Sequence, residues 1–352
     1  MLPGPRLMLT STVASTWTAG SARIDWQPLQ RWWAGAIRSA WLIVACVASG
    51  VAIGCIVGPF EYASTIEIAG RAGTVGLFLT GAVVLSVHGW ARTSLVMECF
   101  ALTIATAVTV PALTSMIAAS GVPYQDDALI AMDRALGFDW PKIVEWFGAR
   151  HQFSIFMSHV YSSLLWQPVV LLPVLAFFDP ERLRRVLAAS TIAMLVTVVI
   201  FAFVPARTGY VHLGYTPEQF PGLLANTGWG VADIIESLRA GDRHITLEGL
   251  ITFPSFHAVA AVLFAYAWSV VPGLRWPFVA LNLVMLVSCV PIGSHYVVDV
   301  IGGMALALAA LQFVSGREPV SPVPRFVPWQ QTPEGQLALA SLDRAAPARR
   351  LA

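Results

Sequence analysis

Residues 253–264 are FPSFHAVAAVLF, so Pro254, Ser255 and His257 stand directly before a run of apolar residues. A proline and a serine ahead of such a run are typical of a helix start with the serine as its cap. The sequence therefore predicts a helix that begins after Ser255 and carries His257 in its first turn. Because a titratable imidazole costs free energy wherever it meets neither water nor a polar partner, its place at the edge of an apolar segment indicates a role.

The composition around this stretch is that of an integral membrane protein. Of the 352 residues, 57% are hydrophobic and only 12% are charged, whereas about a quarter of the residues of a soluble domain are charged. A helix needs roughly 20 apolar residues to cross a hydrocarbon core of about 30 Å. We therefore expect an all-α fold, a polytopic membrane bundle of about eight transmembrane helices. The segments that predict them are residues 41–58, 73–90, 94–119, 155–178, 186–205, 256–272, 276–293 and 296–314.

The basic residues predict which way the bundle faces. If the chain starts in the cytoplasm, about two thirds of its 21 Lys and Arg residues lie on the cytoplasmic side, as the positive-inside rule requires. Residues 1–38 lack the compact apolar core of a signal peptide, and we expect both termini to be cytoplasmic. The basic residues include a single lysine, which points to a GC-rich genome and favours a bacterial inner membrane.

The first extracytoplasmic loop, residues 120–154, contains a segment with helical spacing. Its apolar and polar residues fall on opposite sides, which predicts a short interfacial amphipathic helix. A solvated connector explains the same residues equally well. The apolar side would hold Leu129, Met132 and Leu136, and the polar side Asp126, Asp133 and Arg134.

With this orientation, three segments that lie far apart in the sequence reach the same extracytoplasmic face. They adjoin the second extracytoplasmic loop, residues 206–253, and the last two membrane segments. Ionisable residues at such positions are costly and tend to be functional. The three segments are FVPARTGY at 203–210, FPSFH at 253–257 and GSHYVVDVIGG at 293–303.

The last of these segments contains an imidazole and a carboxylate, His295 and Asp299, four residues apart and therefore on one face of a helix. The carboxylate can accept the second N–H of the imidazole, which fixes the tautomer and raises the basicity of the free nitrogen. In a soluble protein we would interpret an isolated pair of this kind as a structural hydrogen bond. Inside a membrane span it indicates function.

The remaining residues predict a place for a phosphate. The N-terminus of the helix capped by Ser255 presents free N–H groups and a positive dipole end. Arg207, which follows the fifth apolar segment, can offer bidentate hydrogen bonds to phosphate oxygens. Taken singly, Ser255 is better explained as a cap and His257 as an interfacial anchor, and Arg207 is equally well explained as an interfacial lipid anchor.

Together these residues predict phosphoryl transfer without a metal or a cofactor. His295, activated by Asp299, attacks phosphorus and gives a phosphohistidine. His257 protonates the leaving oxygen and then activates a water or an alcohol. Arg207 and the amides after Ser255 hold the equatorial oxygens, whose charge rises in the transition state.

These motifs also resemble a known family. The pattern P-S-x-H at 254–257, followed by S-x6-H-Y-x-x-D at 288–299, is similar to the signature of the type 2 phosphatidic acid phosphatase superfamily. The FPSFH and H-Y-x-x-D-V forms most resemble its branch that contains inositol phosphorylceramide synthase and related lipid phosphotransferases. The stretch DDALIAMDRALGFDW at 126–140 is similar to bacterial members of that branch. The resemblance implies a catalytic triad of His257, His295 and Asp299.

The resemblance also implies a domain organisation. The expected six-helix catalytic core is residues 94–315, and it includes both extracytoplasmic loops. Two accessory transmembrane helices, residues 39–93, precede it. The tails are residues 1–38 and residues 316–352, the second of which we expect to be disordered.

The chain departs from the family's phosphatase pattern at two cationic positions. In place of K-x6-R-P, Ile200 stands seven residues before Arg207, and Thr208 follows it. In place of S-R before the last motif, the chain has Ser288 and Cys289. Members of the synthase-like branch also tend to lack these cations, so the departures favour that branch.

We therefore expect a lipid phosphate phosphatase or a lipid head-group phosphotransferase that acts at the extracytoplasmic face. Its substrate would be a membrane lipid phosphate or a phospholipid, with water, an alcohol or a lipid as acceptor, and no nucleic acid as partner. The main alternative is a proton-coupled transporter with the His/Asp cluster as a relay. A relay predicts ionisable residues near several span midpoints, whereas here they cluster at one end of the spans, with only His88, Glu98 and His159 elsewhere in them.

A metal-dependent hydrolase is a third hypothesis, with His257, His295 and Asp299 as ligands of the ion. Arg207 nearby would then repel the cation.

Overall fold

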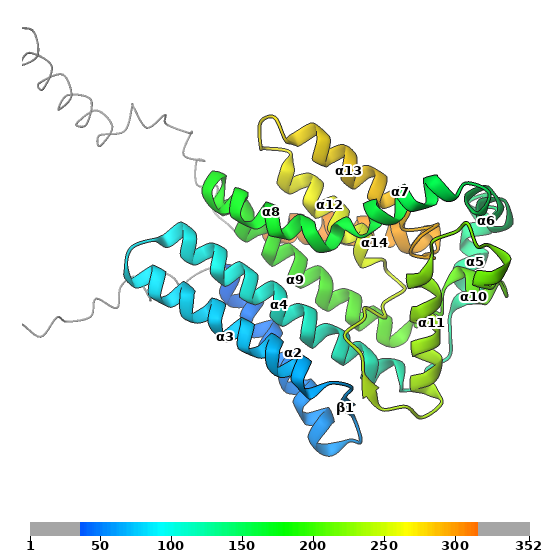
Figure 1. The fold of residues 1–352 in the computed structure, drawn as a ribbon, viewed down its shortest axis with the longest axis horizontal. Helices are drawn as coiled ribbons and strands as arrows, with labels where there is room; N and C mark the ends of the chain where they lie inside the picture. Colours follow the sequence, from blue (N-terminus) through cyan, green and yellow to red (C-terminus); the bar gives the residue numbers. More distant parts are fainter. Residues whose placement is uncertain (1–35, 316–352) are drawn as a thin grey trace, which may run out of the picture. The chain divides into compact units, whose positions relative to one another are not determined.

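A computed structural model describes residues 36–315. The chain forms two compact units, Met1–Leu311 and Gln312–Ala352, and the following concerns the first. The expected tails lie outside the described residues, except that residues 36–38 open the first helix. The described chain is almost wholly helical (Figure 1), which confirms the prediction of an all-α membrane protein.

Six of the eight expected membrane segments fall on a long apolar helix or helix pair, and the other two, residues 256–272 and 276–293, fall on shorter apolar helices. Five helices are long and apolar enough to cross a membrane, and the number rises to six if α7 and α8, which meet at a bend of 40°, form one span. The apolar helices α12 and α13 have only 13 and 14 residues. The helices are α2 (Ala36–Val57), α3 (Thr65–Val87), α4 (Ala91–Ala118), α7 (His151–Tyr161), α8 (Ser163–Phe178), α9 (Pro180–Phe203), α12 (Phe256–Trp268), α13 (Arg275–Ser288) and α14 (Val297–Ser315).

The two loops fold into short elements that gather near the start of α7, as Figure 1 shows. The first loop contains α5 (Asp126–Ala135) and α6 (Trp140–Gly148). The second contains α10 (Gly209–His212), the 3-10 helix η1 (Pro217–Gln219) and α11 (Asn226–Arg239). In addition, β1 (Glu61–Tyr62), in the α2–α3 connection, pairs in parallel with β2 (His244–Ile245) of the second loop.

Two helices begin earlier than their apolar residues predict, because polar caps extend them. Ser64 accepts a hydrogen bond from the backbone N–H of Glu67, so α3 begins at residue 65 and not at 73. Asp179 accepts from the N–H of Arg182, so α9 begins at residue 180 and not at 186. Apolar segments therefore locate membrane helices but not their ends.

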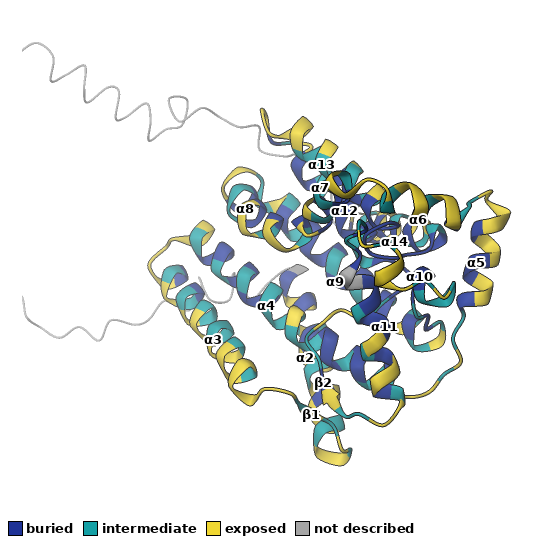
Figure 2. Cartoon of the chain, turned by 45° about the vertical axis from the view of Figure 1, so that its right-hand side comes forward, coloured by how far each residue is buried: buried dark blue, intermediate teal, exposed yellow. Residues whose placement is uncertain are grey.

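Burial distinguishes the inner helices from the outer ones. Within an apolar 18-residue stretch of each helix, 6% of the residues are buried in α3 and 17% in α2, but 44% are buried in α4 and 50% in α9. Figure 2 shows exposed residues along α3. Apolar side chains such as Ile66 and Leu77 are exposed there, as expected of helices that face lipid. The bundle thus packs around α4 and α9.

The predicted helix is present as α5, but the prediction of which of its side chains face solvent is wrong. Asp126 and Asp133, expected on the polar side, are buried, with exposed fractions of 2% and 0%. Met132 and Leu136, expected on the apolar side, are exposed. The buried face of α5 combines these two carboxylates with Leu129 and Ile130, because both carboxylates find hydrogen-bond donors inside the protein.

Candidate functional site

Three segments meet at the start of α12 and α14, as the topology predicted. The backbone N–H of Ser255 donates to the carbonyl of Asp299 at 3.0 Å. The N–H of Gly209 donates to the carbonyl of Ser294, also at 3.0 Å. The hydroxyl of Thr252 donates to the carbonyl of Ala206 at 3.1 Å. These bonds connect the residues after α9, the approach to α12 and the approach to α14 directly.

A glycine pair in α14 permits the close approach of α12. A Cβ atom on Gly303 would lie 2.3 Å from the carbonyl oxygen of Ser255, and one on Gly302 would lie 3.3 Å from Pro254. Only a residue without a side chain fits against backbone at the first of these distances. The glycines after Asp299 therefore bring the capped start of α12 against the first turns of α14.

His295 and Asp299 form the expected pair, but by a different local structure. His295 Nδ1 lies 3.3 Å from Asp299 Oδ2, and both side chains are buried. Helix α14 begins only at residue 297, so His295 belongs to the preceding loop, whose bend uses a positive φ of 55° at Ser294. Asp299 Oδ2 also accepts from the N–H of Tyr296 at 2.9 Å. The carboxylate therefore holds the loop and the imidazole together, and leaves Nε2 of His295 as the free nitrogen.

His257 lies in the first turn of α12, as predicted. Its ring stacks on Tyr161, with centroids 3.8 Å apart and an interplanar angle of 14°. Tyr161 also adjoins His295, because a Cβ atom on Gly293 would lie 2.8 Å from the Tyr161 hydroxyl oxygen and 2.9 Å from Cδ2 of His295. The structure thus brings together both histidines and the carboxylate of the expected triad.

Ser255 has the predicted place at the helix start. Its side chain is buried, and its hydroxyl oxygen accepts from the N–H of Ala258 at 3.4 Å, so it is the N-cap of α12. Its own N–H is occupied by the Asp299 carbonyl. The hydroxyl therefore supports the helix start, and contact with a phosphate would fall to the amides that follow it.

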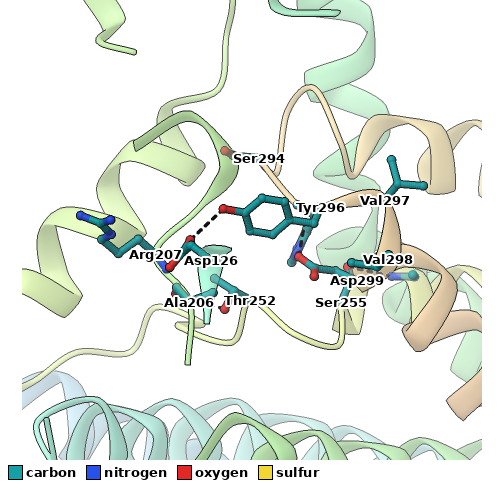
Figure 3. Close-up of polar contacts among 12 residues, drawn as sticks. Asp126, Ala206, Arg207, Thr252, Ser255, Ser294, Tyr296, Val297, Val298 and Asp299 are labelled. Carbon is teal, nitrogen blue, oxygen red and sulfur yellow. Dashed lines mark hydrogen bonds and ion pairs between the residues drawn. The ribbon is translucent and has the colours of Figure 1, made fainter. Parts of the chain in front are cut away.

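Arg207 lies beside the site, but its guanidinium is turned away from the triad. Figure 3 shows this group on the opposite side of Asp126 from Asp299. The Arg207 backbone N–H donates to both oxygens of Asp126, each at 3.1 Å. Its guanidinium lies over the ring of Tyr124 at 5.1 Å, and that of Arg239 lies over the same ring at 3.6 Å. Two guanidinium groups therefore share one aromatic ring at the edge of the site.

Two carboxylates of α5 complete the site, and sequence reasoning had assigned them to the wrong side. Asp126 accepts from the Tyr296 hydroxyl at 2.8 Å (Figure 3). Asp133 accepts from the N–H groups of Val297 and Val298, both at 3.0 Å, and from Trp140 Nε1 at 2.9 Å. Asp133 is therefore the cap of α14.

A signal for these carboxylates was present in the sequence. Residues 126, 129, 130 and 133 follow the spacing i, i+3, i+4, i+7 of a single helix face. Two acids on one face with Leu129 and Ile130 predict buried acids with internal partners.

Tyr296 connects Asp126 of α5 with the loop that carries His295. Burial raises the pKa of its phenol, and the neighbouring Asp126 carboxylate raises that pKa further. The hydroxyl therefore stays protonated and donates to Asp126. This bond fixes the residue next to His295 in the sequence.

Residues 36–315 contain no group of three or more His, Cys, Asp or Glu side chains placed to hold a metal ion. The arrangement has instead the parts of an acid–base and nucleophile pair: a carboxylate-bound imidazole, a second imidazole and a capped helix start.

Comparison with known proteins identifies the family. A family model described as the PAP2 superfamily matches residues 127–313. The chain belongs to this superfamily. The matched region runs from α5 into α14 and includes both site histidines, Asp133 and Asp299. No curated protein and no solved structure matches the chain. As a PAP2 superfamily member with several apolar helices, the protein is a multi-pass membrane protein of a phosphatase and phosphotransferase family that acts on lipid phosphates.

Proposed function

We propose that the protein transfers a phosphoryl-containing group from a membrane lipid to water or to an alcohol, through a phosphohistidine at His295. The observation that carries the proposal is the buried His295–Asp299 pair, which adjoins Tyr161 together with the imidazole of His257. The resemblance of FPSFH and H-Y-x-x-D-V to the inositol phosphorylceramide synthase branch supports transfer to an alcohol.

The proposed reaction has two steps. In the first, Nε2 of His295 attacks phosphorus, the bond from phosphorus to the leaving oxygen breaks, and His257 gives that oxygen its proton. In the second, a water or alcohol oxygen attacks phosphorus, its proton passes to His257, and the phosphorus–nitrogen bond breaks. Asp299 stabilises the positive charge that His295 carries in the intermediate. Entry of water gives hydrolysis, and entry of an alcohol gives transfer.

The amides that follow Ser255 are proposed to bind the phosphoryl oxygens at the start of α12. Arg207 is proposed to contribute charge from the edge of the site, since its guanidinium makes no ion pair with any residue in the range 36–315. Its rotation toward the histidines on substrate binding would complete the anion site.

We also propose the orientation and division of the chain. Both termini lie in the cytoplasm, and the site faces the periplasm of a bacterial inner membrane. Residues 39–93 form the accessory pair, and residues 94–315 form the catalytic core. The burial of α4 and α9 and the exposure of α2 and α3 support this division.

The transporter hypothesis gains no support from the ionisable groups that a relay would need. Glu98 accepts from Trp41 Nε1 at 3.2 Å. The rings of His88 and His159 each lie 2.8 Å from a carbonyl of their own helix. Each of the three groups therefore already has a hydrogen-bond partner within the protein.

The experiment is turnover by the purified protein with labelled phosphatidic acid and labelled phospholipids, with and without a chelator. We expect phosphate release or head-group transfer by the wild type, none by His295→Ala, and wild-type turnover by His159→Ala. His159 is the matched control, because its ring bonds within its own helix. Absence of turnover in the wild type would refute the proposed function. Loss of turnover with the chelator would refute the metal-free mechanism.

A further inference from the structure

Tyr161, the last residue of α7, is an aromatic side chain of the site that the proposed reaction does not yet use. It is 6% exposed, and the chain bends by 40° between α7 and α8 directly after it. Its ring contacts His257 in the first turn of α12. A phenol there can pack as a ring and donate as a hydroxyl.

The ring of Tyr161 is stacked flat on His257. The centroid separation of 3.8 Å and the angle of 14° leave the two rings in full contact. A stacked neighbour restricts rotation of the imidazole, and a general acid must be held in one orientation to give its proton to a defined oxygen. The ring of Tyr161 therefore positions His257.

The hydroxyl of Tyr161 lies near His295. A Cβ atom on Gly293 would lie 2.8 Å from the Tyr161 hydroxyl oxygen and 2.9 Å from Cδ2 of His295. Both groups thus approach the same point on the backbone, and the lack of a side chain at Gly293 leaves room for both. The hydroxyl oxygen therefore lies within 5.7 Å of Cδ2 of the imidazole that is proposed to attack phosphorus.

The site is also short of donors for a phosphoryl group. The guanidinium of Arg207 is turned away from Asp299, and Cys289, which lies with Tyr161 in one core cluster, carries no charge to offer. A phenol beside His295 is a neutral donor in the position where a donor is needed. In a site closed to water, a neutral hydrogen bond to a developing negative charge is strong.

We propose that Tyr161 is a third functional side chain: its ring fixes the plane of His257, and its hydroxyl donates a hydrogen bond to an oxygen of the phosphoryl group bound at His295. This inference rests on the proposed function and names a further residue of the same site. The ligand class is a phosphate ester with a free anionic oxygen.

The test uses the purified full-length protein with short-chain phosphatidic acid and short-chain phosphatidylinositol in detergent micelles. Tyr161→Phe removes only the hydroxyl, and Tyr161→Leu removes the ring as well. Tyr266→Phe is the matched control, since that ring lies under Arg182 near the other end of α12. For each protein kcat, KM, the melting temperature and inhibition by orthovanadate, a mimic of the five-coordinate transition state, are measured.

We expect Tyr161→Phe to lower kcat on the order of 10-fold or more at unchanged KM and melting temperature, because one hydrogen bond to a charged oxygen is lost. Orthovanadate inhibition should weaken by a similar factor, and Tyr161→Leu should lower kcat further. Wild-type kcat and orthovanadate inhibition in Tyr161→Phe would overturn the inference while leaving the proposed function intact. A fall in kcat that only follows a fall in melting temperature would also overturn it. An inactive wild type would refute the proposed function itself.

Discussion

Replacement of Asp133 by asparagine tests whether α5 holds the loop that carries His295. The carboxylate accepts three hydrogen bonds, from Val297, Val298 and Trp140, with no exposure to solvent. An amide has one acceptor oxygen, so either orientation loses at least one of these bonds and sets an N–H group against a buried donor. A hydrogen bond to a charged group contributes about 1.5–3 kcal/mol. We therefore expect the free energy of unfolding to fall by about 2 kcal/mol or more.

The assay compares melting temperature and kcat/KM of Asp133→Asn with those of Asp127→Asn in the same detergent. Asp127 lies in the same helix, six residues before Asp133, but its side chain is 99% exposed and lies 3.4 Å from His212. We expect Asp133→Asn to be less stable and to lose at least 10-fold in kcat/KM. A displacement of His295 that raises the activation free energy by about 1.4 kcal/mol suffices for that factor. Asp127→Asn should behave as the wild type. Wild-type stability and turnover in Asp133→Asn would show that α5 does not hold the loop.

Three further changes test other parts of the site. Asp299→Asn should lower kcat/KM at least 100-fold, because a neutral amide does not stabilise the positive charge of the His295 imidazole in the intermediate; turnover near the wild-type value would exclude the pair from catalysis. Gly303→Ala should lower both melting temperature and turnover, because its Cβ would lie 2.3 Å from a backbone oxygen of the α12 cap, whereas Gly230→Ala, with open space around it, should change neither. Equal behaviour of the two alanine variants would contradict the close packing of α12 on α14. Hydrogen bonds from His244 hold the pKa of Asp242 at about 2, and Asp242 in turn raises the pKa of His244. The contribution of Asp242 to the free energy of unfolding is present above its ordinary pKa of 3.8 and is lost as the pH falls toward 2. The contribution of His244 is present below its ordinary pKa of 6.5 and is lost as the pH rises through its raised pKa. The melting temperature should therefore show a maximum between these limits that flattens in His244→Gln, and an unchanged pH profile in that variant would show that the pair does not stabilise the fold.

Much of the fold follows from local chemistry that the sequence displays. An apolar run predicts a membrane helix because the hydrocarbon core requires one, and Ser255 before such a run predicts a cap because the first amides need an acceptor. The spacing of His295 and Asp299 likewise predicted a bonded pair, although the contact arises from a loop and not from a shared helix face.

Other features depend on contacts between distant segments, which residue type does not reveal. The carboxylates of α5 were expected on the outside because acids usually face water, but the donors that bury Asp133 come from residues about 160 positions away. The direction of the Arg207 guanidinium is set by Tyr124 and by the bonds of its own backbone to Asp126.

In the proposed reaction, the shortness of α12 sets the depth in the bilayer at which phosphorus would react. At 1.5 Å per residue its 13 residues cover about 20 Å, roughly a third less than the apolar thickness of a bilayer. A helix of this length with its Trp268 end at one interface stops about 10 Å below the other, and His257 stops with it. The phosphorus atom of the lipid would then react beneath the head-group plane, near the ester linkages of the lipid, where bulk solvent is scarce. At that depth a lipid hydroxyl can compete with water for the intermediate.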